Sequence, residues 1–327
     1  MQNFSIAAVV QQGRLGYEAL LLAASLRRSD PGFSGRLLLL EPQPGPFWPE
    51  TDPRLPEGPL RARLLELGAE ILPFENRVFG AAYPHGNKIE ALAALPPGPF
   101  LFLDSDTLIT GPLSQTGFDF TRPSASMRRE GTWPQPELYG PGYTAIWKAL
   151  YDRFGLDFAA SLDPSWPDEY WQHYLYFNAG WFFGADAPAF GRVYLEYAAS
   201  IYHDPPPELI CQELLPWLDQ ITLPLVISAF GGGRPGPALA GLDGATSCHY
   251  RSLPLLYARE SDAVVALLEE IALEKANRRL LRDWPQARQM IYLKRGVKAR
   301  ALFDRVALPK REKIIRNTLR RSGLWLR

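Results

Sequence analysis

Cysteine is nearly missing from this sequence, which contains Cys211 and Cys248 and no other in 327 residues. Two cysteines cannot build the disulfide framework of a small secreted domain, so a reducing compartment is the simpler expectation. The chain also lacks an uninterrupted apolar run long enough to cross a bilayer. Its start lacks a basic region followed by a long apolar stretch, so we predict no signal peptide. These absences favour a cytoplasmic protein.

The chain also has no formal net charge at pH 7, because 35 Lys and Arg residues balance 35 Asp and Glu residues. The balance hides a division, since residues 275–327 hold 17 Lys and Arg but only 3 Asp and Glu. The sequence is therefore an acidic body with a basic tail, and such asymmetry indicates an anionic partner for the tail. An apolar share of 46% is that of an ordinary globular protein with a sizeable core.

Apolar runs and helical periodicity alternate along the first hundred residues. Strands are predicted at 4–10, 37–40, 69–74 and 100–103, and helices at 15–26, 60–67 and 88–95. This alternation predicts an α/β fold with a mostly parallel central sheet. Further helices are predicted at 187–202 and 208–217, and the region from residue 259 onward is predicted to be largely helical.

The fourth predicted strand ends on two carboxylates, Asp104 and Asp106, separated by Ser105. Two acids this close repel each other, so a divalent cation between or beside them would explain the pair. The carboxyl ends of strands are also where ligands bind in open α/β sheets, and Gln11 follows the first predicted strand at the same edge. The motif is therefore a candidate metal site.

Three interpretations of this D-x-D motif compete. The carboxylates can cap a following helix in a solvated turn. A phosphatase of the haloacid dehalogenase type carries D-x-D-x-T, but Thr107 stands one residue too early for that pattern. The third interpretation is a site at which Mn²⁺ or Mg²⁺ holds a nucleotide diphosphate, and the rest of the chain favours it.

Several later residues fit a site for an anionic, metal-bound ligand. Lys88 stands at the start of a predicted helix, where a cation is unfavourable unless an anion lies nearby. Asn178 and Gly180 interrupt an aromatic strand over 176–184, which indicates a bulge or the close approach of a ligand. His249 offers a third ligand to a metal held by the two aspartates, although a lone histidine is more often structural.

Taken in order, these residues resemble glycosyltransferase family 8, which includes glycogenin and bacterial lipopolysaccharide galactosyltransferases. Lys88 is followed by FLFLDSD, then by YFNAG, then by an Asp-Gln pair and a His-aromatic pair, over residues 3–251. The resemblance implies a GT-A catalytic domain, which we place at 1–258. It also implies that Mn²⁺ or Mg²⁺ is bound by Asp104, Asp106 and His249.

The same resemblance implies a nucleotide-sugar donor, linked to UDP, and assigns residues to it. Asp219 and Gln220 would be catalytic, the first holding the donor sugar and the second lying near its anomeric carbon. The donor would be bound by Gln11, Lys88, Asp104, Ser105, Asp106, Asn178, Ala179, Gly180 and Arg251. The family often places Gly and Lys after its metal histidine to hold the diphosphate, whereas this chain offers Arg251. A divergent GT-A family and either stereochemical outcome, retaining or inverting, therefore remain open.

Aromatic residues are concentrated between positions 133 and 177. Those among Pro, Gly and acidic residues are predicted to form a rim that stacks on the sugar rings of a saccharide or glycolipid acceptor, and they are Trp133, Tyr139, Trp166, Tyr170 and Trp171. We therefore assign 133–177 to the acceptor side.

The basic tail, 259–327, is predicted to be a helical extension of the catalytic domain. Its last part, 306–327, mixes basic with apolar residues at amphipathic spacing, which suits the surface of an anionic membrane. Alternatively, it covers the acidic surface of its own domain. Nucleic acid is not expected, because the acidic body would repel it.

The sequence thus predicts a metal-dependent glycosyltransferase of cell-surface polysaccharide or glycolipid synthesis, in the cytoplasm or peripheral on the inner membrane face. A sugar-1-phosphate nucleotidyltransferase is the alternative enzyme, and a nucleotide-sugar-binding protein without turnover is the non-enzymatic one.

Overall fold

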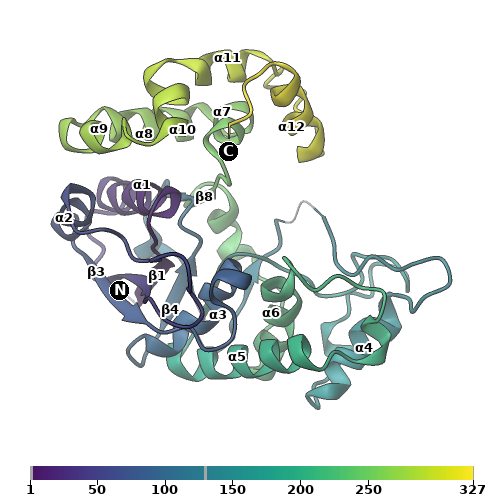
Figure 1. Cartoon of the computed structure of the whole chain (residues 1–327). Coiled ribbons are helices and arrows are strands. Elements are labelled where there is room, and N and C mark those ends of the chain that lie inside the picture. The colour runs from purple at the N-terminus through teal and green to yellow at the C-terminus, as the bar shows by residue number, and fades with distance from the viewer. Residues whose placement is uncertain (1–2, 129–130, 327) are drawn as a thin grey trace.

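The computed structural model describes residues 3–128 and 131–326, and its centre is a six-stranded sheet (Figure 1). The strands run in the order β3 (Ala69–Phe74), β2 (Leu37–Pro42), β1 (Ser5–Val9), β4 (Phe100–Leu103), β7 (Asn178–Gly184) and β6 (Ala125–Ser126). The pairs β3–β2, β2–β1 and β1–β4 are parallel, whereas β7 is antiparallel to both β4 and β6. The predicted α/β fold with a mostly parallel sheet is confirmed.

Both faces of the sheet are buried, which explains the continuous apolar runs of its central strands. Successive side chains of a strand point to opposite faces. Thus Ile6 and Ala8 of β1 belong to the core that contains α1 (Arg14–Ser29) and α2 (Pro59–Glu66). Ala7 and Val9 belong to the core on the other face. That second core contains α3 (Asn87–Ala91), α4 (Tyr143–Arg153), α5 (Ala187–His203) and α6 (Leu218–Ala229).

A layer of helices follows the last strand, β8 (Ser247–His249), and lies beyond α1 from the sheet (Figure 1). It comprises α7 (Leu253–Arg259), α8 (Asp262–Leu273), α9 (Lys275–Leu281), α10 (Pro285–Ala287), α11 (Arg295–Ala301) and α12 (Glu312–Arg321). These helices share one apolar core with α1. The helical C-terminal region is as predicted; α7 spans the boundary proposed at 258, and the division into domains stays a prediction.

Within the described part of the chain, no helix combines the length and apolar character needed to cross a membrane. The first two residues and the last one, which belong to the predicted catalytic domain and basic tail, lie outside the described residues.

Two predicted helices differ from those observed. The helix expected at 208–217 is wrong: a short 3-10 turn, Pro207–Leu209, is followed by irregular chain, and α6 begins only at Leu218. Pro216 explains the late start, because proline disfavours helical backbone in the residue before it. The helix expected at 88–95 is α3 with a 3-10 turn, Leu92–Ala94, after it.

The aromatic strand predicted at 176–184 is β7, and its pairing with β6 is irregular. The register shifts between Ala125, which faces Phe182, and Ser126, which faces Asn178. The interruption read from Asn178 and Gly180 is therefore a real break in the pairing of this strand.

Candidate functional site

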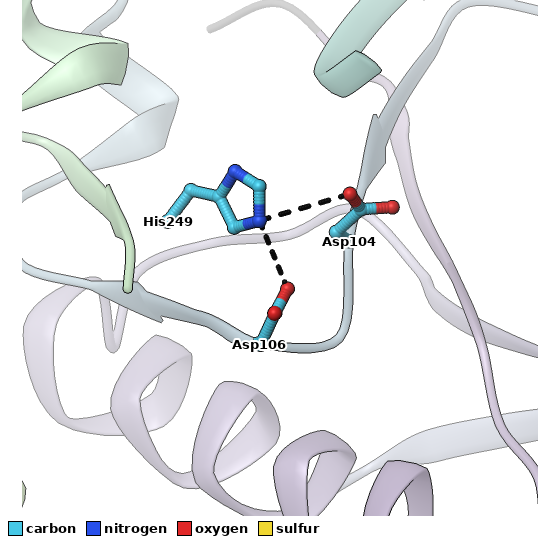
Figure 2. Close-up of side chains that lie close together, drawn as sticks. All are labelled: Asp104, Asp106 and His249. Carbon is cyan, nitrogen blue, oxygen red and sulfur yellow. Dashed lines mark ion pairs between the residues drawn. The ribbon is translucent and has the colours of Figure 1, made fainter. Parts of the chain in front are cut away.

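A short two-stranded ribbon brings His249 to the two aspartates. After β4, Asp104 leads through Ser105 and Asp106 into β5 (Thr107–Ile109), which pairs antiparallel with β8 so that Thr107 faces His249. The backbone N–H of Tyr250 donates to the carbonyl oxygen of Asp106 at 3.0 Å and closes the end of the ribbon. Figure 2 shows the imidazole pointing toward both carboxylates.

The three side chains lie close enough to share one ion. His249 Nε2 is 3.0 Å from Asp106 Oδ1 and 3.7 Å from Asp104 Oδ2, and the three possible ligand atoms all lie within 4.8 Å of one another. Two carboxylate oxygens with one imidazole suit Mn²⁺ or Mg²⁺, and the imidazole favours Mn²⁺. The residues present therefore fit the predicted metal, with room for a ligand on the cleft side.

Gly180 makes this arrangement possible. A Cβ at this position would collide with the His249 ring, mainly at its Nδ1 atom. The carbonyl oxygen of Gly180 accepts the N–H of Asp104 at 2.9 Å, so the same residue also aligns the chain after β4. Gly180 thus leaves the space that the His249 ring occupies, and its predicted contact with the donor stays a prediction.

The carboxyl groups of Asp106 and Glu18 lie close together, and their pKa values are shifted in opposite directions. Burial by itself would raise the pKa of the Asp106 carboxyl, but His249, together with Arg14 and Lys88, lowers it to about 2. Burial raises the pKa of the Glu18 carboxyl well above its ordinary value, and the negative charge of Asp106 raises it further. Glu18 lies under the loop, where Ser105 Oγ donates to its Oε2 at 3.1 Å. Asp106 is therefore held ionised, as a metal ligand must be.

Lys88 is buried and forms ion pairs with both Asp104 and Asp219. Its Nζ lies 2.7 Å from Asp104 Oδ1, 3.2 Å from Asp219 Oδ2 and 3.2 Å from the carbonyl oxygen of Ala179. Burial would lower the pKa of Lys88, but the two aspartates raise it above its ordinary value. An ammonium group has three N–H donors, and all three have partners here.

Asp219 and Gln220 stand in the first turn of α6 and line the same cleft as the aspartates. Asp219 is buried, and its Oδ1 accepts a hydrogen bond from the Tyr83 hydroxyl at 2.8 Å. Gln220 Oε1 accepts one from the Tyr176 hydroxyl at 3.0 Å. The structure thus brings this pair to the metal cluster, 113 or more residues along the chain from Asp106.

The other predicted donor residues divide into two groups. Asn178 and Ala179 line the cleft, although the Asn178 side chain donates to the Arg128 carbonyl at 2.9 Å and accepts from Gly180 N–H at 2.9 Å. Gln11 and Ser105 instead line a smaller, adjoining cavity. Arg251 lines the cleft as well.

The cleft and the adjoining cavity meet at the candidate metal site formed by Asp104, Asp106 and His249. The cleft has a volume of about 640 Å³ and the cavity about 290 Å³. Lys88, Asp104 and Asp106 line both spaces, and His249 lines the cleft. Two joined hollows of this size, with convergent polar groups where they meet, suit a ligand with two parts.

The predicted aromatic rim is wrong for Trp133, which is buried and packs edge-on against Trp147 with 5.3 Å between ring centres. None of the other four predicted rim residues is among those that line the cleft. Tyr176 and Trp217 are the aromatic residues that do line it. Trp217 is 43% exposed and stands directly before α6. Its position follows from the late start of that helix.

Several residues line the cleft without having been predicted, and two groups of them are charged or can become so. His85 lines both hollows, and its only signal is its closeness to Lys88. Glu312, Lys313, Arg316 and Arg320 reach the cleft from α12, in the tail predicted for a membrane. Amphipathic spacing predicts a helix with one polar face, but it does not predict what that face meets.

The sequence model of the Rhodobacterales glycosyltransferase domain matches residues 6–231 of this chain. A comparison with curated proteins finds no match. Among solved structures, the galactosyltransferase LgtC in complex with donor and acceptor sugar analogs is similar at 11% identity and a TM-score of 0.42, covering 95% of this chain and 100% of that one.

Two other glycosyltransferase structures are similar. The bifunctional WbbM matches at 13% identity and a TM-score of 0.48, over 86% of this chain and 51% of that one. GlyE of Streptococcus pneumoniae TIGR4 matches at 14% identity and a TM-score of 0.39, over 72% of this chain and 46% of that one. Each TM-score is below 0.5, so these likenesses bear on neither substrate nor mechanism.

Proposed function

The chain belongs to the Rhodobacterales glycosyltransferase family, and we propose that it is a metal-dependent enzyme that transfers a sugar from a UDP-linked donor to a glycan or glycolipid acceptor. The observation that carries this proposal is the group of Asp104, Asp106 and His249 at the junction of two hollows. The nucleoside occupies the smaller cavity, the diphosphate lies at the junction, and the donor sugar extends into the cleft.

Sugar transfer requires that the bond between the anomeric carbon and the phosphate oxygen break, which leaves negative charge on the diphosphate. Mn²⁺ or Mg²⁺ held by the three side chains would act as a Lewis acid that stabilises this charge. The residues of the chain do the positioning. Lys88 holds Asp104 and Asp219 at 2.7 and 3.2 Å, and Asp219 and Gln220 orient the donor sugar in the cleft.

The proposed metal site, formed by Asp104, Asp106 and His249, can be tested with Asp106→Asn. This substitution keeps the shape of the side chain and removes its charge. We expect Mn²⁺-dependent release of UDP from UDP-sugars to fall more than roughly 100-fold, because loss of even an outer partner of a metal ligand costs about 10- to 100-fold. Glu75→Gln is the matched control, because Glu75 is exposed and lines neither the cleft nor the adjoining cavity. Turnover by Asp106→Asn equal to that of the control would refute the metal site.

Two reaction mixtures separate this proposal from its two alternatives. A glycosyltransferase releases UDP from a UDP-sugar and an acceptor. A sugar-1-phosphate nucleotidyltransferase releases pyrophosphate from UTP and a sugar 1-phosphate, and a binding protein releases neither product from either mixture. A thermal-shift titration of UDP with and without Mn²⁺ provides the binding measurement, since a ligand stabilises the folded state that it binds.

We also propose that the enzyme acts at the surface of a membrane. Basic residues on the exposed side of the C-terminal region would hold the enzyme against the anionic inner face of a membrane, where lipid-linked acceptors lie. Two apolar residues of α12, Ile315 and Leu319, are buried in the core together with Leu324, whereas Ile314 is 49% exposed. Charge would therefore provide most of this attachment.

A further inference from the structure

The C-terminal helix α12 forms one wall of the cleft, at the end of the C-terminal layer (Figure 1). Its apolar side, with Ile315 and Leu319, is packed in the core. Its other side turns Lys313, Arg316 and Arg320 to the cleft. This helix lies outside residues 6–231, to which the family match extends.

A buried glutamate anchors the helix beside the metal cluster. Glu312 Oε2 lies 3.1 Å from Arg251 Nη1 and 2.8 Å from Arg259 Nη1, and Arg316 pairs with Oε1. Burial opposes ionisation of Glu312, but Arg251, Arg259 and Arg316 lower its pKa below the ordinary value. Because Arg251 follows the metal-site histidine by two positions, the wall begins next to the proposed metal.

Among the described residues of this wall, positive charge exceeds negative charge. Glu312 is the acid there, and the basic residues are Arg251, Lys313, Arg316 and Arg320. The side chains of Lys313 and Arg320 are both exposed. Within residues 3–128 and 131–326, neither has a carboxylate partner. Such a wall is unfavourable in the empty cleft and favourable with an anion in it.

The arginines of the wall are held in place as well as charged. The guanidinium carbons of Arg316 and Arg320 each lie 5.5 Å from the centre of the Trp325 ring. The Nε atom of Arg316 is buried and finds no hydrogen-bond partner in the described part of the chain. An ordered guanidinium binds phosphate oxygens through two parallel N–H donors at a lower entropy cost than a mobile one.

We propose that Lys313, Arg316 and Arg320, together with Arg251, form a phosphate-binding wall in the cleft. The phosphate belongs either to the diphosphate of the donor, in which case the inference rests on the proposed function, or to a phosphorylated acceptor. In the first case the wall neutralises the departing diphosphate, and three of its four basic residues come from the tail. In the second it selects acceptors by their charge.

Lys313→Gln/Arg320→Gln tests the wall, because both side chains are exposed and their loss leaves the Glu312 ion pairs in place. The probe is inorganic pyrophosphate, titrated calorimetrically into the full chain without metal. We expect binding to weaken at least about 10-fold, the loss of two charge-assisted contacts. Lys310→Gln/Arg321→Gln is the matched control, with the same change of charge at two exposed residues outside the cleft.

Further titrations identify the source of the phosphate. Weaker binding of UDP with Mn²⁺, with uridine binding unchanged, assigns the wall to the donor. If UDP binding is unchanged while glycerol 3-phosphate binds more weakly to protein saturated with UDP and Mn²⁺, the wall serves the acceptor.

Equal pyrophosphate binding by the variant, the control and the wild type would overturn the inference. That result is distinguishable from failure of the proposed function, because Asp106→Asn would still abolish the Mn²⁺-dependent part of UDP binding. Arg316→Lys is a second variant that keeps the charge and removes the paired donors. Intermediate weakening by this variant would support recognition by a guanidinium, and weakening equal to that of the control would contradict it.

Discussion

The cleft has a floor, formed by Lys88, Asp104 and Asp219, and the phosphate-binding wall of α12. The lysines of these two parts differ in their surroundings. On the floor, Lys88 is buried, and its three N–H donors are used by Asp104, Asp219 and the Ala179 carbonyl. On the wall, Lys313 is exposed and has no carboxylate partner in the described residues. A buried charge must be satisfied inside the protein, whereas an exposed one remains available to a ligand. We therefore infer that Lys88 positions Asp104 and Asp219, and its contact with the donor stays a prediction.

The largest effect should come from breaking the floor. Lys88→Met leaves Asp104 and Asp219 without their common cation, and Asp219 is buried. We expect the free energy of unfolding to fall by about 3–5 kcal/mol, the cost of removing one partner of a buried ion pair. Urea unfolding measures the loss.

Lys148→Met is the control for this change, because the Lys148–Asp152 pair is exposed on α4. Its loss should cost less than about 1 kcal/mol. Similar losses for the two variants would mean that the floor is not an internally satisfied network.

A smaller effect should come from the buried acid of the wall. Glu312→Gln removes the carboxylate shared by Arg251, Arg259 and Arg316, and we expect a loss of about 1–3 kcal/mol at pH 7. The pKa of Glu312 is lower in the folded state than its ordinary value of 4.5. Its stabilisation is therefore present above pH 4.5 and is lost as the pH falls through the lowered pKa.

The difference between wild type and Glu312→Gln should accordingly shrink in acid, and urea unfolding at pH 7, 5 and 3.5 would measure it. A difference that stays constant over this range would show that the carboxylate charge does not hold α12 in place.

The smallest effect concerns the basic surface outside the cleft. We expect wild-type protein to sediment with vesicles that contain anionic lipid, and Lys310→Gln/Arg321→Gln to bind them more weakly, by about 1 kcal/mol per residue removed. Lys313→Gln/Arg320→Gln should change vesicle binding less, because these residues face the cleft. If the two double variants lose binding equally, the wall and the outer surface do not differ in their ligands.

Most of the sheet could be read from the sequence. The strands at 69–74 and 100–103 have the predicted bounds, since Gly68 and Pro99 directly precede them and are local signals of where a strand begins. The meeting of Asp104, Asp106 and His249 was also predicted, but from a resemblance in the order of motifs. The reason for the meeting, the pairing of β5 with β8, involves three residues on each side and leaves no clear local pattern.

The sequence by itself determined the α/β alternation, the carboxylates at the end of β4 and the amphipathic character of the tail, because each depends on neighbours within a few positions. Only the tertiary structure decided that α12 turns its basic side to the cleft and that Trp217, not Trp133, lines it. Those placements depend on how distant segments pack around a shared core, and local periodicity contains no information about the partner that a helix face will meet.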